Sequence, residues 1–515
     1  MRETLVLLLC CALLGTVFVQ HPAATEAAAA KGGRVLSEWC EVCSEVVGAL
    51  DALLDSEPSQ EVVNSTLNLV CRLVFATNPT SLATCEKFVA EYRDVVLFNF
   101  EEEVDAGRVC SGLDMCITDP TAPRFPHSAF TTGPSRVAVS WFTYEPTNSS
   151  LATWSATPNG PSLGVVQGYS KSYLPAGGYM HHAVITGLKP RTEYYYRVGD
   201  KETGLSEAFS FMTAPAQSVP FTVAIYGDMG VHNSRDTVAR VQSLVQSRAI
   251  DWIFHIGDIS YADDYPANIY EYVWNEWFRV MQPITSRVPY MGCEWYSKNF
   301  TAYNFKFRMP GLEENGSNSN MWYSLDYSYA HFVSFSAETD YPNAPYSAQF
   351  GDQVKWFEAD LRAAHARRSP ERPWIIVVGH RPIYTSNAQT QGAPSGYAIN
   401  LQKTFEELLH KYEVDLYITG HEHSYERVWP TLRNQVVQRN YSRPAATAYL
   451  ITGAAGCTEG LTPWKEEFVP EWSAFRTNTV WGFSTLAVSA DRLEWRYLNS
   501  ADGSLVDSFV LTRGA

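Results

Sequence analysis

Three hydrophobic patterns follow one another along the chain. Between residues 36 and 118, apolar positions recur at helical spacing, which predicts amphipathic helices. Short alternating runs occupy residues 121–215, as in VAVSWF, and predict strands with one buried face. From residue 219 to 515, continuous apolar runs of strand length are separated by longer segments, as in a sheet covered on both faces. Together these patterns predict an α+β multidomain protein with a small all-α domain, an all-β domain and an α/β domain.

Residues 1–27 fit none of these patterns. Arg2 precedes an apolar run from Leu5 to Val19, and small residues follow the run, as in a cleaved secretory signal peptide. A membrane anchor is the alternative, but the run is shorter than the roughly 20 apolar residues that a bilayer requires. Secretion predicts an oxidising environment for the remaining cysteines. It also makes the N-x-S/T sequons candidate glycosylation sites, and these are Asn64, Asn148, Asn299, Asn315 and Asn440.

Six cysteines lie within the helical stretch and begin with a C-x2-C pair. The residues alone leave many connectivities open, but the spacing among amphipathic helices resembles a saposin B-type domain at 36–118. A domain of this size depends on disulfides because its core is small. Two roles stay open for it: contact with lipid or a membrane surface, and an intramolecular spacer or chaperone for the enzyme. The resemblance implies the pairs Cys40–Cys116, Cys43–Cys110 and Cys71–Cys85.

Four apolar runs in the last domain, FTVAIY, WIFHI, WIIVV and DLYIT, each end in glycine followed by an ionisable residue. Ligands of α/β proteins bind at the carboxyl ends of strands, and glycine lets the backbone turn sharply there. One Gly-Asp after a strand is usually only a turn. A set of acidic, phenolic and imidazole groups at four strand ends needs partners when buried, and metal ions satisfy it. The set is Asp228, Asp258, Tyr261, His380, His421 and His423.

These residues stand in GDMG, GDISY, GH and GHEH strings between Thr222 and Arg427, which resemble the motifs of the purple acid phosphatases. The resemblance implies a two-sheet metallophosphoesterase fold at 219–515 with a closing segment at about 445–512. It also implies an acid phosphatase that attacks small phosphate monoesters with a metal-bound hydroxide. Its Fe(III) ligands would be Asp228, Tyr261 and His423, its bridging ligand Asp258, and its ligands to a divalent Fe, Zn or Mn ion His380 and His421.

The middle domain and the ligand chemistry agree with this resemblance. LKPRTEYYYRVGD at 188–200 resembles the end of a fibronectin type III-like sandwich, in which such residues pin a strand corner, and long purple acid phosphatases carry such a domain. Carboxylates and a phenolate suit Fe(III), whereas imidazoles suit a divalent ion. The formal net charge of −16 argues against a nucleic-acid partner.

One motif of the family is absent. The family continues the stretch SRVPYM into GNHE, but here the stretch runs into Gly292-Cys293-Glu294. An asparagine ligand and a catalytic histidine are therefore missing, and Gln389 and Thr390 stand where some relatives have a helper histidine. The catalytic residues stay unassigned. Three explanations are open: a lost segment, a substitute ligand at Glu294 or Asn299, or a weakened homologue. We expect the second metal to bind less tightly than in relatives with the intact motif.

Two other functions remain alternatives. An acid sphingomyelinase-like phosphodiesterase also joins a saposin-type domain to a metallophosphoesterase core, and a decayed phosphatase could serve as a lipid-binding protein. Tyr261 and the fibronectin-like domain favour the phosphatase. The sequence predicts residence outside the cell or in a lysosomal or vacuolar lumen. Cys293 and Cys457 either bond each other or remain thiols.

Overall fold

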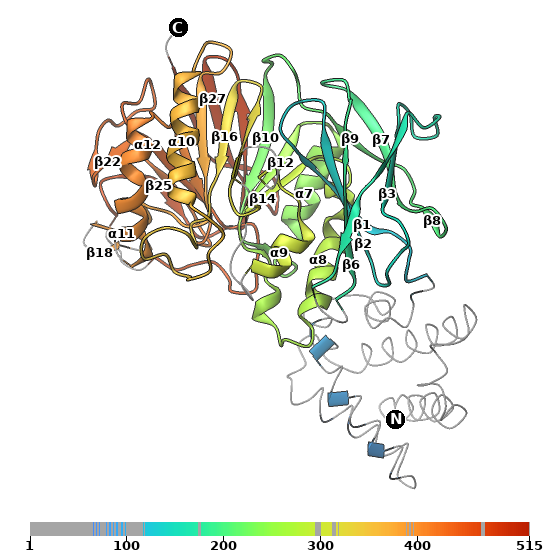
Figure 1. The fold of residues 1–515 in the computed structure, drawn as a ribbon. Coiled ribbons are helices and arrows are strands. Elements are labelled where there is room, and N and C mark those ends of the chain that lie inside the picture. The colour runs from blue at the N-terminus through green and yellow to red at the C-terminus, as the bar shows by residue number, and fades with distance from the viewer. Residues whose placement is uncertain are drawn as a thin grey trace. The chain divides into compact units, whose positions relative to one another are not determined.

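The chain forms two compact units in the computed structural model. One unit is Met1–Pro120 with Ala262–Glu276, and the other is Thr121–Tyr261 with Trp277–Ala515 (Figure 1). The predicted signal peptide, the six cysteines of the saposin-like stretch and three sequons, Asn64, Asn299 and Asn315, lie outside the described residues and stay predictions. The described residues are 119–173, 177–293, 300–311, 316–317, 319–387, 389–390, 393–394, 396–464 and 469–513, with isolated positions between 65 and 117.

In the smaller unit, Phe98 packs on the segment Ala262–Glu276. The Phe98 side chain is 1% exposed, and its ring meets Tyr265 and Tyr272 edge-on at centroid distances of 4.9 and 5.5 Å. Described positions between Ser65 and Phe98 are helical, as the apolar spacing predicts. Burial of Phe98 within the chain favours intramolecular packing over lipid contact for this apolar position, because an aromatic ring gains most from being removed from water.

The sandwich at the start of the larger unit consists of two antiparallel sheets, in the orders β1-β2-β6-β5 and β4-β3-β7-β8, with β9 paired to β7. The first sheet contains β1 (Arg124–Phe130), β2 (Val137–Thr143), β5 (Tyr169–Lys171) and β6 (Tyr179–Ile185). The second contains β3 (Leu151–Ser155), β4 (Gly164–Gln167), β7 (Glu193–Asp200), β8 (Gly204–Leu205) and β9 (Phe209–Met212).

Alternating apolar residues of both sheets form one core. Trp141 on β2 and Tyr196 on β7 are 0% exposed and belong to the same cluster, so the two sheets pack face to face. The Lys189 N–H donates to the Tyr194 hydroxyl at 3.0 Å, which is how the predicted corner is pinned. The β-sandwich prediction is therefore confirmed.

The rest of the larger unit is built on two further sheets, in the orders β14-β12-β10-β26-β27-β28 and β15-β16-β17-β20-β24-β21-β25. The first contains β10 (Phe221–Tyr226), β12 (Trp252–Ile256), β14 (Tyr290–Cys293), β26 (Gly482–Val488), β27 (Arg492–Asn499) and β28 (Leu505–Thr512). The second contains β15 (Tyr323–Tyr327), β16 (Ala330–Ser334), β17 (Trp374–Val378), β20 (Leu416–Thr419), β21 (Tyr425–Val428), β24 (Ala448–Thr452) and β25 (Ser473–Thr477).

Helices flank these sheets, with α10 and α12 beside the second sheet in Figure 1. α10 buries one apolar stripe, which includes Phe357 and Leu361. The helices of this unit are α7 (Arg235–Gln246), α9 (Thr301–Lys306), α10 (Gln353–Ala366), α11 (Tyr397–Leu401) and α12 (Glu407–Lys411). A further helix, α8 (Tyr270–Thr285), begins in the smaller unit and ends in the larger one. Shorter elements are β11 (Met229–Gly230), β13 (Ile259–Ser260), β18 (Gln389–Thr390), β19 (Ala393–Pro394), β22 (Thr431–Leu432), β23 (Gln435–Val436), a 3₁₀ turn at Ala262–Asp264 and a π-helical turn at Gln402–Glu406.

The four strands predicted to lead into the site form two parallel pairs. β10 pairs with β12 in the first sheet, and β17 pairs with β20 in the second. Backbone hydrogen bonds join the two sheet edges, because the Gly227 N–H after β10 donates to the Thr452 carbonyl at the end of β24 at 3.0 Å. All four carboxyl ends therefore lead toward one place between the sheets.

Three sequence features can be compared with the structure: the sequons, the last two cysteines and the helices. Asn148 and Asn440, the two described sequon asparagines, are both exposed. Cys293 and Cys457 are not bonded to each other within the described residues, and Cys457 is a buried thiol. None of the described helices has the length and apolar content needed to cross a bilayer.

A buried histidine network ties β16 to its neighbours and makes stability depend on pH. His331 Nδ1 lies 2.7 Å from Asp326 Oδ1, and its Nε2 lies 2.8 Å from Asp360 Oδ2. Burial disfavours the charged ring, but the two carboxylates outweigh burial and raise the pKa of His331 from 6.5 to about 9. The stabilising interaction is therefore complete below pH 6.5 and is lost as the pH rises through about 9.

Replacement of His331 by glutamine is expected to lower stability most at mildly acidic pH. The loss should reach at most about 3 kcal/mol below the ordinary histidine pKa, and several degrees in Tm, and should shrink at alkaline pH. Thermal unfolding of both proteins on either side of this range measures the effect. His410→Gln on α12 is the control, and an equal Tm loss at both pH values would contradict the prediction.

Candidate metal centre

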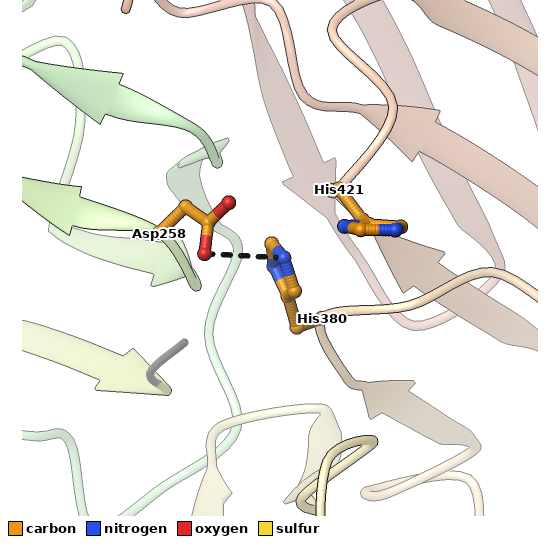
Figure 2. Close-up of side chains that lie close together, drawn as sticks. All are labelled: Asp258, His380 and His421. Carbon is orange, nitrogen blue, oxygen red and sulfur yellow. Dashed lines mark ion pairs between the residues drawn. The ribbon is translucent and has the colours of Figure 1, made fainter. Parts of the chain in front are cut away.

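The six predicted side chains converge where the two sheets meet. The ligand atoms of five of them form two groups, each with all atoms within 4.8 Å of one another. Asp258 is common to both groups. One group adds His380 and His421, and the other adds Asp228 and His423. Asp258 follows β12 in the first sheet, whereas His380 and His421 follow β17 and β20 in the second, and Figure 2 shows these three side chains facing one another.

Tyr261 completes the group around Asp228. Its hydroxyl lies 2.9 Å from His423 Nε2, 3.2 Å from Asp258 Oδ2 and 3.5 Å from Asp228 Oδ1. All four side chains are buried. Their exposed fractions are 0% for Asp228, 4% for His423, 6% for Tyr261 and 7–8% for Asp258. The phenol oxygen therefore shares one enclosed space with two carboxylates and an imidazole.

Two of the histidines are held by backbone carbonyls through Nδ1. His380 Nδ1 lies 3.1 Å from the Ile256 carbonyl oxygen, and His423 Nδ1 lies 2.8 Å from that of Gly460. Donation from Nδ1 directs Nε2 toward the carboxylates, and the Nε2 lone pair becomes available to a metal ion once the ring loses its second proton. His380 Nε2 is 3.3 Å from Asp258 Oδ1 (the dashed line in Figure 2). Metal-binding histidines are usually oriented in this way.

The backbone is strained at several of these residues. Asp228, Asp258, Tyr261 and His421 have φ values of 60°, 50°, 56° and 70°, a left-handed region that costs residues other than glycine about 1–3 kcal/mol each. The sequence pattern GHxH predicts alternate strand-like positions with both imidazoles on one side. The strand-like geometry is wrong, because the chain bends at His421. The two rings join different ligand groups, and these groups share Asp258.

Glycine is required where the backbone passes behind a ligand. A Cβ at Gly257, whose φ is +99°, would lie 2.3 Å from His380 Nδ1. A Cβ at Gly420 would lie 2.2 Å from Asp228 Oδ2. Both distances are shorter than van der Waals contact, so the glycines before Asp258 and His421 let the two sheet edges approach.

Carboxylates and imidazoles pair their charges in the absence of metal. Burial opposes the charge on His380, but Asp258 outweighs burial and raises the pKa of His380 to about 9. Burial also lowers the pKa of His423, but the hydrogen bond and charge of Asp228 outweigh burial and raise this pKa to about 12. Burial raises the pKa of Asp228, whereas at Asp258 the charge of His380 prevails over burial and lowers the pKa. Cations that enter this site would replace protons on the imidazoles.

The donor set fits a pair of metal ions. The buried Asp258 Oδ1 has His380 Nε2 as a charged neighbour at 3.3 Å, and a buried carboxylate oxygen needs such a positive partner, a part that a bound cation would take over. Two carboxylates, a phenol and three imidazoles provide both the hard ligands that Fe(III) prefers and the nitrogen ligands that suit a divalent ion.

The strand before the missing family motif is present. β14 pairs in parallel with β12, and Cys293 at its end lies opposite Ile256, two residues before Asp258. Glu294 and Asn299, the suggested substitute ligands, lie outside the described residues. Gln389 and Thr390 form β18, which pairs with β19.

Sequence reasoning missed several neighbours of these ligands. Arg381 directly follows His380 and donates from Nη1 to His421 Nε2 at 2.7 Å, and its Nε binds Glu338. Cys457 Sγ lies 3.3 Å from His423 Nδ1. Adjacency to His380 could have identified Arg381, but nothing local marks Glu338, which follows β16.

Three stretches of the chain match known families. Residues 123–213 match the family described as the N-terminal domain of purple acid phosphatase. Residues 221–425 match the calcineurin-like phosphoesterases, and residues 446–508 match the family described as iron/zinc purple acid phosphatase-like protein C. The two ligand groups lie within the second of these matches.

Individual relatives extend over most of the chain. Acid phosphatase type 7 of Homo sapiens is 33% identical over 415 residues, which is 76% of this chain and 91% of that protein. Probable purple acid phosphatase 20 of Arabidopsis thaliana is 30% identical over 415 residues, covering 76% and 88%. A purple acid phosphatase structure from yellow lupin seeds has the same fold, with a TM-score of 0.65 at 24% identity over 77% of this chain and 75% of that one. The chain belongs to the purple acid phosphatase family.

Proposed function

We propose that the protein is an acid phosphatase that hydrolyses small phosphate monoesters at a centre of Fe(III) and a divalent Fe, Zn or Mn ion. The observation that carries the proposal is the position of Asp258, which is common to two ligand groups. One carboxylate shared by two ligand sets suits a pair of adjacent ions, because it can supply negative charge to both. Two such ions, when bound, would orient a phosphoryl group and activate a water molecule.

Each side chain has a distinct part in this proposal. Asp228, Tyr261 and His423 would hold Fe(III), and His380 and His421 would hold the divalent ion. The carbonyl contacts of His380 and His423 keep their Nε2 atoms directed inward. Burial of these groups limits water, which strengthens their electrostatic effect on an anionic substrate.

The proposal includes a location and an N-terminal accessory domain. We propose that the chain is secreted or resides in a lysosomal or vacuolar lumen, with the disulfides expected for a saposin B-type domain at 36–118. Exposure of Asn148 and Asn440 is consistent with glycans at these positions. The packing of Phe98 on Tyr265 and Tyr272 supports the spacer or chaperone role over lipid binding.

The sphingomyelinase-like alternative is less well supported. A saposin-type domain and a metallophosphoesterase core are common to both interpretations, so the middle domain and Tyr261 distinguish them. The β-sandwich that matches the purple acid phosphatase N-terminal domain at 123–213 and the Tyr261 hydroxyl, 3.2 Å from Asp258 Oδ2, both favour the phosphatase.

Tyr261→Phe is expected to remove the visible colour of the iron-loaded protein. Charge transfer from the Tyr261 phenolate to Fe(III) would produce that colour, and phenylalanine cannot supply it. Hydrolysis of an aryl phosphate at acid pH should fall by about tenfold or more, as when a metal site loses a supporting group. Visible absorption, metal analysis and the hydrolysis assay check this, with Tyr412→Phe as the control. A colourless, zinc-only wild-type protein, or one without turnover after metal loading, would contradict the proposed function.

A further inference from the structure

An arginine beside the proposed ligands is buried together with its own carboxylate. Arg381 is 6% exposed, and Glu338 is 0% exposed. Arg381 Nε donates to both Glu338 carboxylate oxygens, at 2.7 and 2.9 Å. A buried ion pair gives little net stability compared with apolar residues of the same size. Stability alone therefore does not explain why this pair lies beside the proposed ligands.

Two further contacts fix the orientation of the guanidinium. Nη1 donates to His421 Nε2 at 2.7 Å. The guanidinium carbon lies 5.0 Å from the centroid of the Tyr397 ring, and the Tyr397 hydroxyl donates to Glu422 at 2.7 Å. Glu338 thus anchors one edge of the planar group, Tyr397 covers a face, and the other edge is directed at a proposed ligand.

The contact between Arg381 and His421 is incompatible with a metal on the His421 ring. Neutral imidazole has one lone pair. If the metal took Nε2, the lone pair that accepts from Arg381 would be used. If the metal took Nδ1, Nε2 would carry the proton and could no longer accept. In both cases Nη1 must find another acceptor while Glu338 still holds Nε.

We infer that Arg381 binds a phosphoryl oxygen of the substrate or of product phosphate when His421 carries its metal. Guanidinium presents several N–H donors in one plane, which matches phosphate oxygens. The group already lies within hydrogen-bond distance of the His421 ring, so an anion bound to that metal would be within reach. This inference rests on the proposed phosphatase function. The chain has a net charge of −16, so a positive side chain such as Arg381 would help it to attract an anion.

The affinity for inorganic phosphate tests the inference. Isothermal titration with phosphate is performed on the metal-loaded full chain of wild type, Arg381→Met and Arg381→Lys. Loss of one charge-assisted hydrogen bond should weaken phosphate binding about tenfold to a hundredfold in Arg381→Met. The phosphate affinity of Arg381→Lys should lie between those of wild type and Arg381→Met, because lysine keeps the positive charge but lacks the planar set of N–H donors. Arg492→Met, an exposed arginine paired with Glu494, is the matched control and should bind phosphate as wild type does.

Zinc affinity gives a readout that does not depend on turnover. Competition with a chelating dye should show Arg381→Met binding zinc at least as tightly as wild type, because the guanidinium no longer competes for His421. The double variant Glu338→Gln/Arg381→Met removes both buried charges and replaces the single variant if that one does not fold.

The outcomes separate the two proposals. Phosphate affinity unchanged in a well-folded Arg381→Met protein, or zinc binding weakened by the substitution, overturns the role of Arg381 and leaves the phosphatase proposal intact. A metal-loaded wild type that neither binds phosphate nor hydrolyses an aryl phosphate overturns both. Weaker phosphate binding with zinc retained supports the inference.

Discussion

Asp258→Asn is expected to abolish phosphate ester hydrolysis and to deplete both metal positions. Asp258 contributes to both ligand groups, whereas Asp228 contributes to one. An amide keeps the shape of the side chain but lacks the negative charge that holds two cations together. Because residues that merely support a ligand affect metal binding 10- to 100-fold, loss of a shared ligand should reduce activity by more than about 100-fold. Hydrolysis of an aryl phosphate and metal content per chain measure the two effects.

Two comparisons make this result specific. Asp228→Asn should deplete mainly the ion held by Asp228 and His423, so metal analysis should distinguish the two variants. Asp491→Asn, in an exposed turn, should retain metals and activity. A folded Asp258→Asn protein that keeps two ions per chain would show that Asp258 is not a shared ligand.

Gly257→Ala is expected to displace His380 and to destabilise the fold. The added Cβ would lie 2.3 Å from His380 Nδ1 and 2.7 Å from its Cγ, at a residue with φ of +99°. The ring must shift, which breaks its 3.1 Å contact with the Ile256 carbonyl. The combined overpacking and backbone strain should cost about 2–4 kcal/mol. Thermal unfolding and the occupancy of the second metal position measure the two consequences.

Gly133→Ala separates strain from collision. Gly133 has a similar φ of +85°, but a Cβ there would meet no described atom within 4 Å. The free energy of unfolding of this control should fall by only about 1 kcal/mol, which is the cost of alanine in a left-handed backbone conformation. The control should keep both metals. If the two alanine variants have the same Tm and metal content, close approach at Gly257 does not matter.

Local patterns determined the elements and the chemistry of the candidate site. Continuous apolar runs predict β10, β12, β17 and β20, and all four strands are found. The alternation around Trp141 predicts a strand with one buried face, and Trp141 lies in the core of the sandwich. These predictions succeed because side-chain periodicity and the turn preferences of glycine are properties of neighbouring residues. The same strings contain six ionisable side chains within a few residues of strand ends.

Tertiary structure decided how these parts are combined. Two sheets, joined by bonds such as that from Gly227 to Thr452, bring the ends of β12 and β17 together. The left-handed backbone at Asp228 and His421 is held by long-range contacts, since the His421 N–H donates to the Asp228 carboxylate at 2.9 Å. Local propensity disfavours that conformation, so the sequence pattern could not predict it.

The partners of the ligands also depend on packing between distant segments. Arg381 pairs with Glu338, 43 positions earlier in the chain, and Cys457 lies against His423 instead of bonding to Cys293. The sequence by itself thus determined which residue types stand at the strand ends, because those follow from local order along the chain. Packing of the two sheets decided the rest. It determined which of these residues lie around a common carboxylate, in which direction each imidazole ring points, and that Arg381 lies beside them.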